Sequence, residues 1–141
     1  MTQFYKETIV DSLVWIGAFS DRDQYREKSK LIFDFLVKDN KVKIYITDYI
    51  VVETVNFLLR KENFNVASLV LDLFLQSENI EIVYVDNFMM ENMNKIFEKY
   101  KTLSLTDCSI IALMEEKNIK HLFSFDAGFD KVKEIMRKDG I

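Results

Sequence analysis

Four acidic residues stand where a carboxylate can take part in chemistry: Asp11, Glu53, Asp107 and Asp126. Asp11 and Asp126 each end a short apolar run that is typical of a β-strand, whereas Glu53 and Asp107 fall on helical patterns with apolar neighbours. Carboxylate oxygens and water are the ligands that Mg²⁺ and Mn²⁺ prefer over nitrogen or sulfur. The set therefore predicts a site for a hard divalent cation.

Each acid also has an ordinary structural interpretation. Asp11, between a strand and a helix, is a natural N-cap, and Asp107 is the third helical position of a capping box that begins at Ser104. Asp126 precedes Ala127 and Gly128 and is a turn former, with Gly128 expected at a positive φ.

Glu53 is less easily explained by local structure. Ile50 three residues before it and Phe57 four residues after it place the carboxylate on the apolar stripe of a helix. A buried acid is costly unless a cation compensates it, so the alternatives are a metal ion or an arginine or lysine partner.

Other chemistries find little support in the sequence. No glycine-rich phosphate loop is present, the single His121 has no serine or cysteine nucleophile beside it, and the single Cys108 excludes an internal disulfide and a zinc cluster. The net charge of −4 argues against a broad basic surface for duplex DNA but does not exclude RNA. Candidate phosphate contacts are Arg22, Arg26, Lys28, Lys30, Arg60 and Lys61, although ordinary solvated helix faces account for most of them.

The elements that must position these acids alternate along the chain. Strands are predicted at 7–11, 43–47, 80–85 and 121–125, and helices at 12–19, 25–38, 48–61, 66–76, 87–100 and 104–117. This alternation predicts an α/β fold with a parallel sheet covered by helices on both faces. Ligands of such sheets bind beyond the carboxyl ends of the strands, where Asp11 and Asp126 are placed.

Length and composition set the frame for this fold. The 141 residues, of which 49% are hydrophobic, suit one domain over residues 1–141. No apolar run approaches the roughly 20 residues of a membrane span, and the first seven residues show no secretory signal. We therefore expect a cytoplasmic protein with no membrane association.

Four short motifs, in this order and spacing, resemble those of PIN domains, particularly the VapC-type toxin ribonucleases. They are Ile-Val-Asp-Ser at 9–12, Val-Val-Glu-Thr-Val-Asn at 51–56, Leu-Thr-Asp-Cys at 105–108, and Phe-Ser-Phe-Asp-Ala-Gly-Phe-Asp at 123–130. The resemblance covers nearly the whole chain, from Ile9 to about Val132. Two departures are Cys108, where alanine is common, and a short charged tail after Asp130, which leaves the usual last strand open.

The resemblance implies a three-layer α/β/α, Rossmann-like fold with a central, mostly parallel sheet. It also implies an endoribonuclease that uses Mg²⁺ or Mn²⁺, a homodimer, and an antitoxin whose peptide occupies the active-site groove. The acids carried over are Asp11, Glu53, Asp107 and Asp126, with Asp130 as a candidate fifth and Ser12 and Thr106 as supporting polar groups. We expect Asp11, Asp107 and Asp126 to hold metal and Glu53 to bind or orient its water, with one or two ions left open.

Several alternatives remain at the level of sequence. The chain could be a PIN-fold RNA-processing nuclease outside a toxin system, a flap-type nuclease acting on DNA, or a degenerate PIN domain that only binds. A receiver-like signalling module also gathers acids around Mg²⁺, but it requires a phosphoacceptor near Asp86 and a lysine after a later strand, and it gives Glu53 and Asp107 no role.

Overall fold

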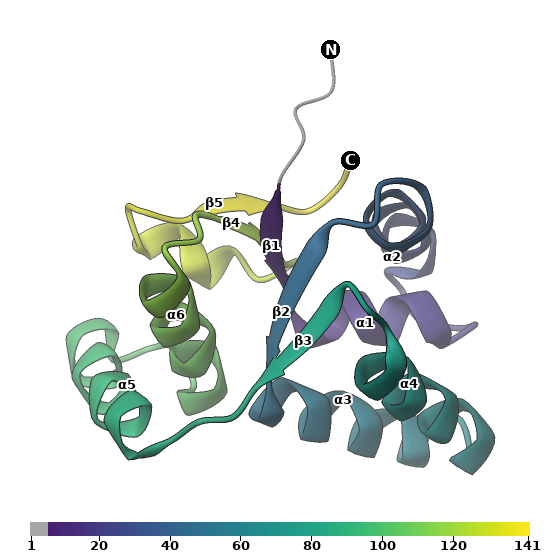
Figure 1. Cartoon of the computed structure of the whole chain (residues 1–141), viewed down its shortest axis with the longest axis horizontal. Helices are drawn as coiled ribbons and strands as arrows, with labels where there is room; N and C mark the ends of the chain where they lie inside the picture. Colours follow the sequence, from purple (N-terminus) through teal and green to yellow (C-terminus); the bar gives the residue numbers. More distant parts are fainter. Residues whose placement is uncertain (1–5) are drawn as a thin grey trace.

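A five-stranded sheet forms the centre of the protein, for which a computed structural model describes residues 6–141 (Figure 1). Its strands are β1 (Glu7–Val10), β2 (Lys43–Thr47), β3 (Ile80–Val83), β4 (His121–Phe123) and β5 (Met136–Lys138). They lie in the order β3-β2-β1-β4-β5, and every neighbouring pair is parallel. The predicted parallel sheet is confirmed.

The register of the central strands decides where the first acid lies. Val10 of β1 is opposite Phe123 of β4, and the Asp11 N–H donates to the Phe123 carbonyl at 2.9 Å. The chain segments after β1 and β4 therefore emerge side by side at the carboxyl edge of the sheet, although they are far apart in sequence.

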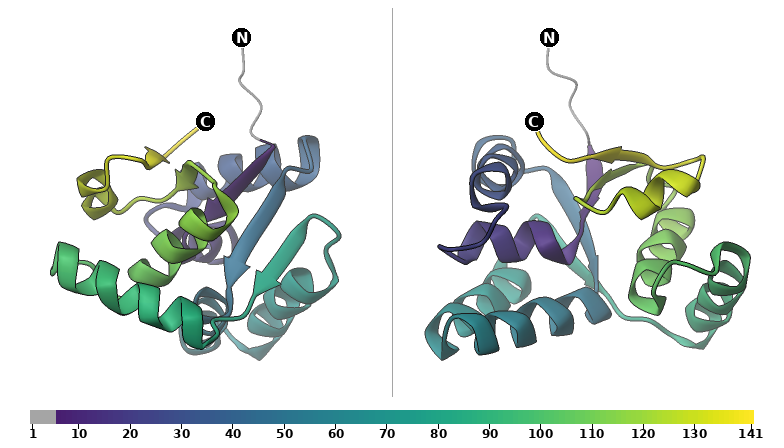
Figure 2. Two further views of the ribbon diagram at one scale, coloured as in Figure 1. Left: turned by 60° about the vertical axis from the view of Figure 1, so that its left-hand side comes forward. Right: turned by 180° about the vertical axis from the view of Figure 1, so that it is seen from behind.

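Helices cover both faces of this sheet, as Figures 1 and 2 show from three sides. They are α1 (Ser12–Phe19), α2 (Arg26–Phe33), α3 (Asp48–Lys61), α4 (Phe64–Gln76), α5 (Asn87–Tyr100) and α6 (Leu105–Lys117). The first four pack together on one side, and α5 and α6 pack against each other on the other side. The three-layer α/β/α prediction is confirmed. No helix within residues 6–141 is long and apolar enough to cross a membrane.

Trp15 anchors α1 to the sheet and to the other helices on its side. The ring is buried, its Nε1 donates to the Val10 carbonyl at 3.0 Å, and it meets Phe74 and Phe33 edge-on. Burial of such a ring stabilises the fold by roughly 2–3 kcal/mol. This packing fixes the start of α1, and with it Asp11.

Gly17 shows how closely α2 approaches α1. A Cβ atom at this position would lie 2.2 Å from the Ser29 Oγ and 2.8 Å from its Cβ, so a side chain would push the two helices apart. The absence of a Cβ, rather than an unusual backbone angle, is what the sequence needs here.

Several local expectations change in the structure. The predicted helix over 25–38 begins at Arg26 as α2 and widens into a π-helical segment, η1 (Asp34–Asp39), in which the N–H of Asn40 reaches back to the Phe35 carbonyl. The third and fourth strands, predicted to run to 85 and 125, stop at Val83 and Phe123. The charged tail, which the sequence left open, does form a last strand, β5.

The expectation for Gly128 is wrong, because no glycine of the described residues has a positive φ. Gly128 lies in the 3₁₀ helix η2 (Ala127–Lys131), and its N–H donates to Asp126 Oδ1 at 2.8 Å. A Cβ there would come within 2.9 Å of that same oxygen, so close approach explains the glycine. The prediction about a secretory signal concerns mainly residues 1–5, which lie outside the described residues.

Candidate active site

The four predicted acids line one cleft at the carboxyl edge of the sheet. The cleft has a volume of about 390 Å³ and is lined by Asp11, Ser12, Leu13, Ile16, Glu53, Phe57, Arg60, Asp107 and Asp126. These residues come from the β1–α1 junction, α3, the first turn of α6 and the segment after β4. Four segments separated in sequence thus contribute one carboxylate each.

Asp11 is the most enclosed of these acids, with 5% of its surface exposed. Its Oδ1 accepts the Ser12 N–H at 2.8 Å, which caps α1, and its Oδ2 accepts the Ser124 hydroxyl at 2.8 Å. Burial raises the pKa of Asp11 to about 6, the two hydrogen bonds oppose that shift, and the charges of Asp107 and Glu53 add to it. The N-cap and the cleft-lining carboxylate are therefore the same residue.

Ser124 is a residue of the site that the sequence analysis quoted in a motif but did not select. Its side chain is fully buried; its hydroxyl donates to Asp11 and accepts the Asp126 N–H at 3.0 Å. One hydroxyl therefore joins the acid after β1 to the acid after β4. The signal that could have revealed it is a hydroxyl residue two positions before an acid at a strand end.

Asp107 lies half-buried at the start of α6, in the predicted capping box. Ser104 Oγ accepts the Asp107 N–H at 3.0 Å, and Asp107 Oδ2 accepts the Ser104 N–H at 3.2 Å. Burial raises the pKa of Asp107, hydrogen bonds from Ser104 oppose the shift, and the charges of Asp126 and Glu53 raise it further. Burial and like charge therefore both disfavour the ionised form of Asp107.

Glu53 is exposed at the cleft, so its expected place on the apolar stripe of the helix is wrong. The buried positions of α3 are Ile50, Val51, Thr54 and Leu58, so the stripe passes beside Glu53. The spacing of Ile50 and Phe57 fits an apolar stripe that includes Glu53 as well as one that passes beside it. Only the packing of α3 decides between these two stripes. Glu53 is therefore not a buried acid and does not need an arginine or lysine partner.

Asp126 lines the cleft while its Oδ1 also accepts the Gly128 N–H, so the turn-forming interpretation holds as well. Asp130 lies outside the cleft lining. It is exposed and bound by Arg137 through two contacts, Nε to Oδ1 at 2.9 Å and Nη2 to Oδ2 at 3.1 Å, and this pairing lowers the pKa of Asp130.

Arg137 ties the last strand to the site and was not predicted. Its Nη1 donates to the Ser124 carbonyl at 3.1 Å, and the pKa of its guanidinium is raised mainly by the hydrogen bond to Asp130, with a smaller effect of the Asp126 charge. Thus β5 supports the segment that carries Ser124 and Asp126.

The remaining candidates divide between the cleft and the surface. Ser12 and Arg60 line the cleft, whereas Thr106 does not, and its carbonyl accepts the Ser109 hydroxyl at 2.6 Å. Arg60 is the one cation of the cleft lining, as far as the described residues go. The receiver-like alternative loses support, because neither Asp86, which caps α5 through the Met89 N–H, nor any lysine of residues 6–141 lines the cleft.

The donor chemistry of the cleft fits a hard divalent cation. The cleft is lined by carboxylate oxygens, which are suitable ligands for such an ion. A bound cation would also offset the electrostatic cost of burying Asp11 and of bringing like charges together. Within residues 6–141 no three acid, histidine or cysteine side chains are already grouped as they would be around a metal ion. The fit therefore rests on the type of donors and not on a preformed cage.

Comparison with known proteins agrees with this architecture. Residues 8–135 match the sequence model of the PIN domain. Among solved structures, the VapC20 toxin of Mycobacterium tuberculosis, which cleaves the sarcin–ricin loop, is similar at 18% identity and a TM-score of 0.77, over 89% of this chain and 95% of that chain. A toxin–antitoxin complex from Klebsiella pneumoniae is similar at 16% identity and a TM-score of 0.70, over 95% and 99% of the two chains.

A third solved structure, VapBC2 from Rickettsia felis bound to a DNA fragment from its promoter, is similar at 14% identity and a TM-score of 0.66, over 94% of this chain and 97% of that chain. No curated protein sequence matches this chain. At these identities the structural likeness establishes the fold, and the match to the sequence model covers most of the chain.

Proposed function

The chain belongs to the PIN domain family, and on that premise we propose that it is a metal-dependent endoribonuclease that hydrolyses RNA phosphodiester bonds. One observation carries the proposal: four carboxylates from four separate segments line a single cleft in which just one cation, Arg60, is found among the described residues. Such an excess of negative charge around the buried Asp11 and the half-buried Asp107 is costly unless it serves to bind cations.

In this proposal Asp11, Asp107 and Asp126 would hold Mg²⁺ or Mn²⁺. A bound ion of this kind lowers the pKa of water and stabilises negative charge that develops on a phosphate. Ser12 and Ser124 keep both oxygens of Asp11 oriented through hydrogen bonds of 2.8 Å. The pKa of about 6 leaves Asp11 mostly ionised at pH 7 and above, which a ligand for a cation requires.

Glu53 and Arg60 act on water and substrate in this scheme. The exposed carboxylate of Glu53, at the edge of the cleft, accepts a hydrogen bond from the attacking water and orients it. The guanidinium of Arg60, two turns further along the same face of α3, binds a phosphate of the RNA backbone. Asp130 acts only indirectly, by holding Arg137 against the Ser124 carbonyl.

We further propose that the protein is the toxin of a toxin–antitoxin pair, cytoplasmic and homodimeric, with an antitoxin peptide in the cleft. Support comes from the fold that it shares with toxin–antitoxin complexes, and from the apolar side of the cleft, where Leu13, Ile16 and Phe57 could receive such a peptide. Expression without an antitoxin should arrest growth for the wild type but not for Asp11→Asn. Equal growth of the two strains would contradict the toxin role.

The nuclease itself is tested with a pool of structured RNAs and the purified chain in Mg²⁺, Mn²⁺ or EDTA. We expect cleavage only with metal, and none for Asp107→Asn, because the asparagine oxygen still accepts the Ser104 N–H and preserves the cap while the charge is lost. Cleavage in EDTA, or full activity of Asp107→Asn, would overturn the assignment.

A further inference from the structure

Tyr25 and Phe125 form a ring pair unlike the others described in the protein. Their rings are stacked, with centroids 4.1 Å apart and planes 13° from parallel. In the core, Trp15 meets Phe33 and Phe74 and Phe19 meets Phe33 at interplanar angles of 75–83°. Tyr25 and Phe125 are both partly buried; Phe125 packs against the edge of the core with part of its surface still exposed, and Tyr25 stacks on it.

Phe125 is the neighbour in sequence of two residues of the acid site, although neither ring of the pair is part of the cleft lining. Phe125 stands between Ser124, which holds Asp11, and Asp126, which lines the cleft. Its backbone is fixed on both sides, since the Ser124 N–H donates to the Lys138 carbonyl and the Asp126 N–H donates to the Ser124 hydroxyl. The ring is therefore held on the same rigid segment as two groups of the site.

The backbone of Tyr25, the second residue of the pair, is also held by hydrogen bonds. Its N–H donates to Asp23 Oδ2 at 2.9 Å, and its carbonyl accepts the Ser29 N–H at 2.9 Å in the first turn of α2. Its hydroxyl has no hydrogen-bond partner among residues 6–141. The ring of Tyr25 is thus held in place by the hydrogen bonds of its backbone and by its stacking on Phe125.

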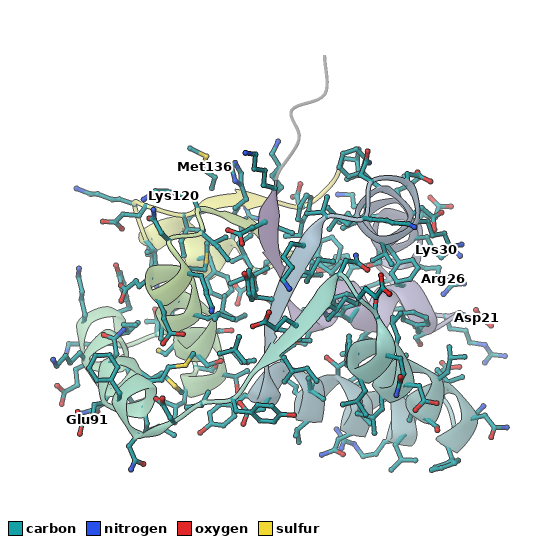
Figure 3. All side chains as sticks on the ribbon, viewed as in Figure 1. Asp21, Arg26, Lys30, Glu91, Lys120 and Met136 are labelled. Atoms are coloured by element: carbon teal, nitrogen blue, oxygen red, sulfur yellow. The ribbon has the colours of Figure 1, made fainter. Side chains whose placement is uncertain are left out.

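Tyr25 also lines an open surface depression of about 640 Å³, whose charged lining residues are three acids, Asp21, Asp23 and Glu27, and two cations, Arg26 and Lys28. Arg26 lies in this lining; its Nη1 donates to the Ala18 carbonyl at 2.6 Å and its Nη2 lies 3.3 Å from Asp21. Figure 3 shows Asp21, Arg26 and Lys30 together at the outer end of the molecule, where α1 meets α2. The exposed Lys28 is the second cation of the depression.

We propose that the Tyr25–Phe125 pair is a platform on which one unpaired base of a single-stranded RNA stacks, next to the phosphate that enters the acid cleft. Only an unpaired base can offer its face to a protein ring, so the platform would select single-stranded or loop segments over duplex. The platform rests on the proposed nuclease function, for which it names a substrate contact.

The test measures the affinity of an unstructured RNA oligonucleotide, with Ca²⁺ in place of Mg²⁺ to keep the strand intact. Loss of one stacked base weakens binding roughly 5- to 150-fold, and we expect this for Tyr25→Leu and Phe125→Leu. Tyr25→Phe keeps the ring and should bind within about twofold of wild type. Phe97→Leu, which removes a half-exposed ring on α5 outside the cleft, is the matched control and should change nothing.

A set of oligonucleotides with one abasic nucleotide at successive positions separates stacking from a general disturbance of the fold. In the wild type one position should lose the same factor as Tyr25→Leu does. In Tyr25→Leu that position should have no further effect, because the partner ring is already gone. Additive losses, or equal losses at all positions, would overturn the platform.

The outcome for the platform is independent of the outcome for the nuclease. Metal-dependent cleavage with unchanged RNA affinity in both leucine variants would overturn the platform and keep the nuclease, leaving the ring pair to packing or to a protein partner. Position-dependent stacking without cleavage would support the platform and overturn the nuclease. An equal loss in Tyr25→Phe and Tyr25→Leu would also overturn the stacking role, because the hydroxyl would then carry the affinity.

Discussion

Two hollows of similar size lie at different places on the protein and differ in charge. The acid cleft, of about 390 Å³, holds four carboxylates and one guanidinium, that of Arg60. The second hollow, of about 310 Å³ and lined by the last turns of α5 and α6, holds two lysines, Lys99 and Lys120, and two glutamates, Glu115 and Glu134. Its other lining residues are Tyr100, Ile111, Met114, Asn118, Ile119, Val132 and Ile135.

The difference teaches that unbalanced charge, rather than volume, marks the candidate site. In the acid cleft, burial and neighbouring carboxylates raise the pKa of both Asp11 and Asp107, so folding works against their ionisation. In the second hollow the charges of the two lysines balance those of the two glutamates. A protein keeps an electrostatic cost of the first kind where a cation or a reaction uses it.

The largest expected effect is on catalysis. Asp126→Asn should lower RNA cleavage by about 10³-fold or more, because a ligand charge is lost while the amide oxygen still accepts the Gly128 N–H. Glu134→Gln, in the second hollow, should leave cleavage within about twofold. Initial rates with a labelled RNA check both variants, and a comparable loss in the two would break the comparison.

The next effect is on stability without metal. Because the pKa of Asp11 rises from 3.8 to about 6 on folding, the folded protein binds a proton that the unfolded chain releases. This contribution to stability is full below pH 3.8 and is lost as the pH rises through about 6, at a cost of roughly 3 kcal/mol.

Asp11→Asn should therefore raise the free energy of unfolding of the metal-free protein by about 1–3 kcal/mol at pH 7.5, with little gain near pH 4. Urea titrations at the two pH values measure it, and Asp72→Asn on the exposed face of α4 is the control. Added Mg²⁺ should narrow the difference, since it stabilises only the protein that binds it. Equal stability of wild type and Asp11→Asn at pH 7.5 would contradict the raised pKa.

A smaller effect is expected at Ser124. Ser124→Ala removes the donor to Asp11 and the acceptor of the Asp126 N–H, at a cost of about 1–3 kcal/mol in stability. Because the lost hydrogen bond had lowered the pKa of Asp11, the acid limb of the pH–rate profile should move to higher pH. Ser124→Thr keeps the hydroxyl and should restore the profile; a limb that does not move in Ser124→Ala would exclude this role.

The smallest effect concerns long-range charge. Arg60→Gln should weaken RNA binding several-fold and reduce the slope of log affinity against log salt by about 0.7, the value for one phosphate contact on a single strand. Lys120→Gln, in the second hollow, should leave the slope unchanged. Binding titrations between low and high salt decide the matter, and equal slopes for the two variants would remove Arg60 from the substrate path.

The sequence was informative where chemistry coincides with local structure. Asp11, Asp107 and Asp126 were found because each ends a strand or begins a helix, and in the structure each also serves as a cap or turn former. The two interpretations do not compete: hydrogen bonds from the backbone occupy one side of each carboxylate and hold it in place.

Prediction failed where distance along the chain matters. The stripe of α3 could pass through Glu53 or Thr54, and only packing against neighbouring helices selects Thr54. The spacing of Ser124 and Asp126 could mark Ser124 as a candidate, but its hydrogen bond to Asp11 joins positions 113 residues apart, and no local pattern shows the contact of Arg137 with the Ser124 carbonyl. The contacts of this hydroxyl and this guanidinium are evident only once β4 and β5 are placed in the sheet.

That same hydrogen bond has a consequence for how the protein is made. Asp11 leaves the ribosome early, but Ser124, Asp126 and the strand that supports them are synthesised after the other elements of the sheet. Contacts of such long range close late in folding. We therefore expect a nascent or partly folded chain to be harmless to RNA, because the cleft does not exist until β4 has joined β1.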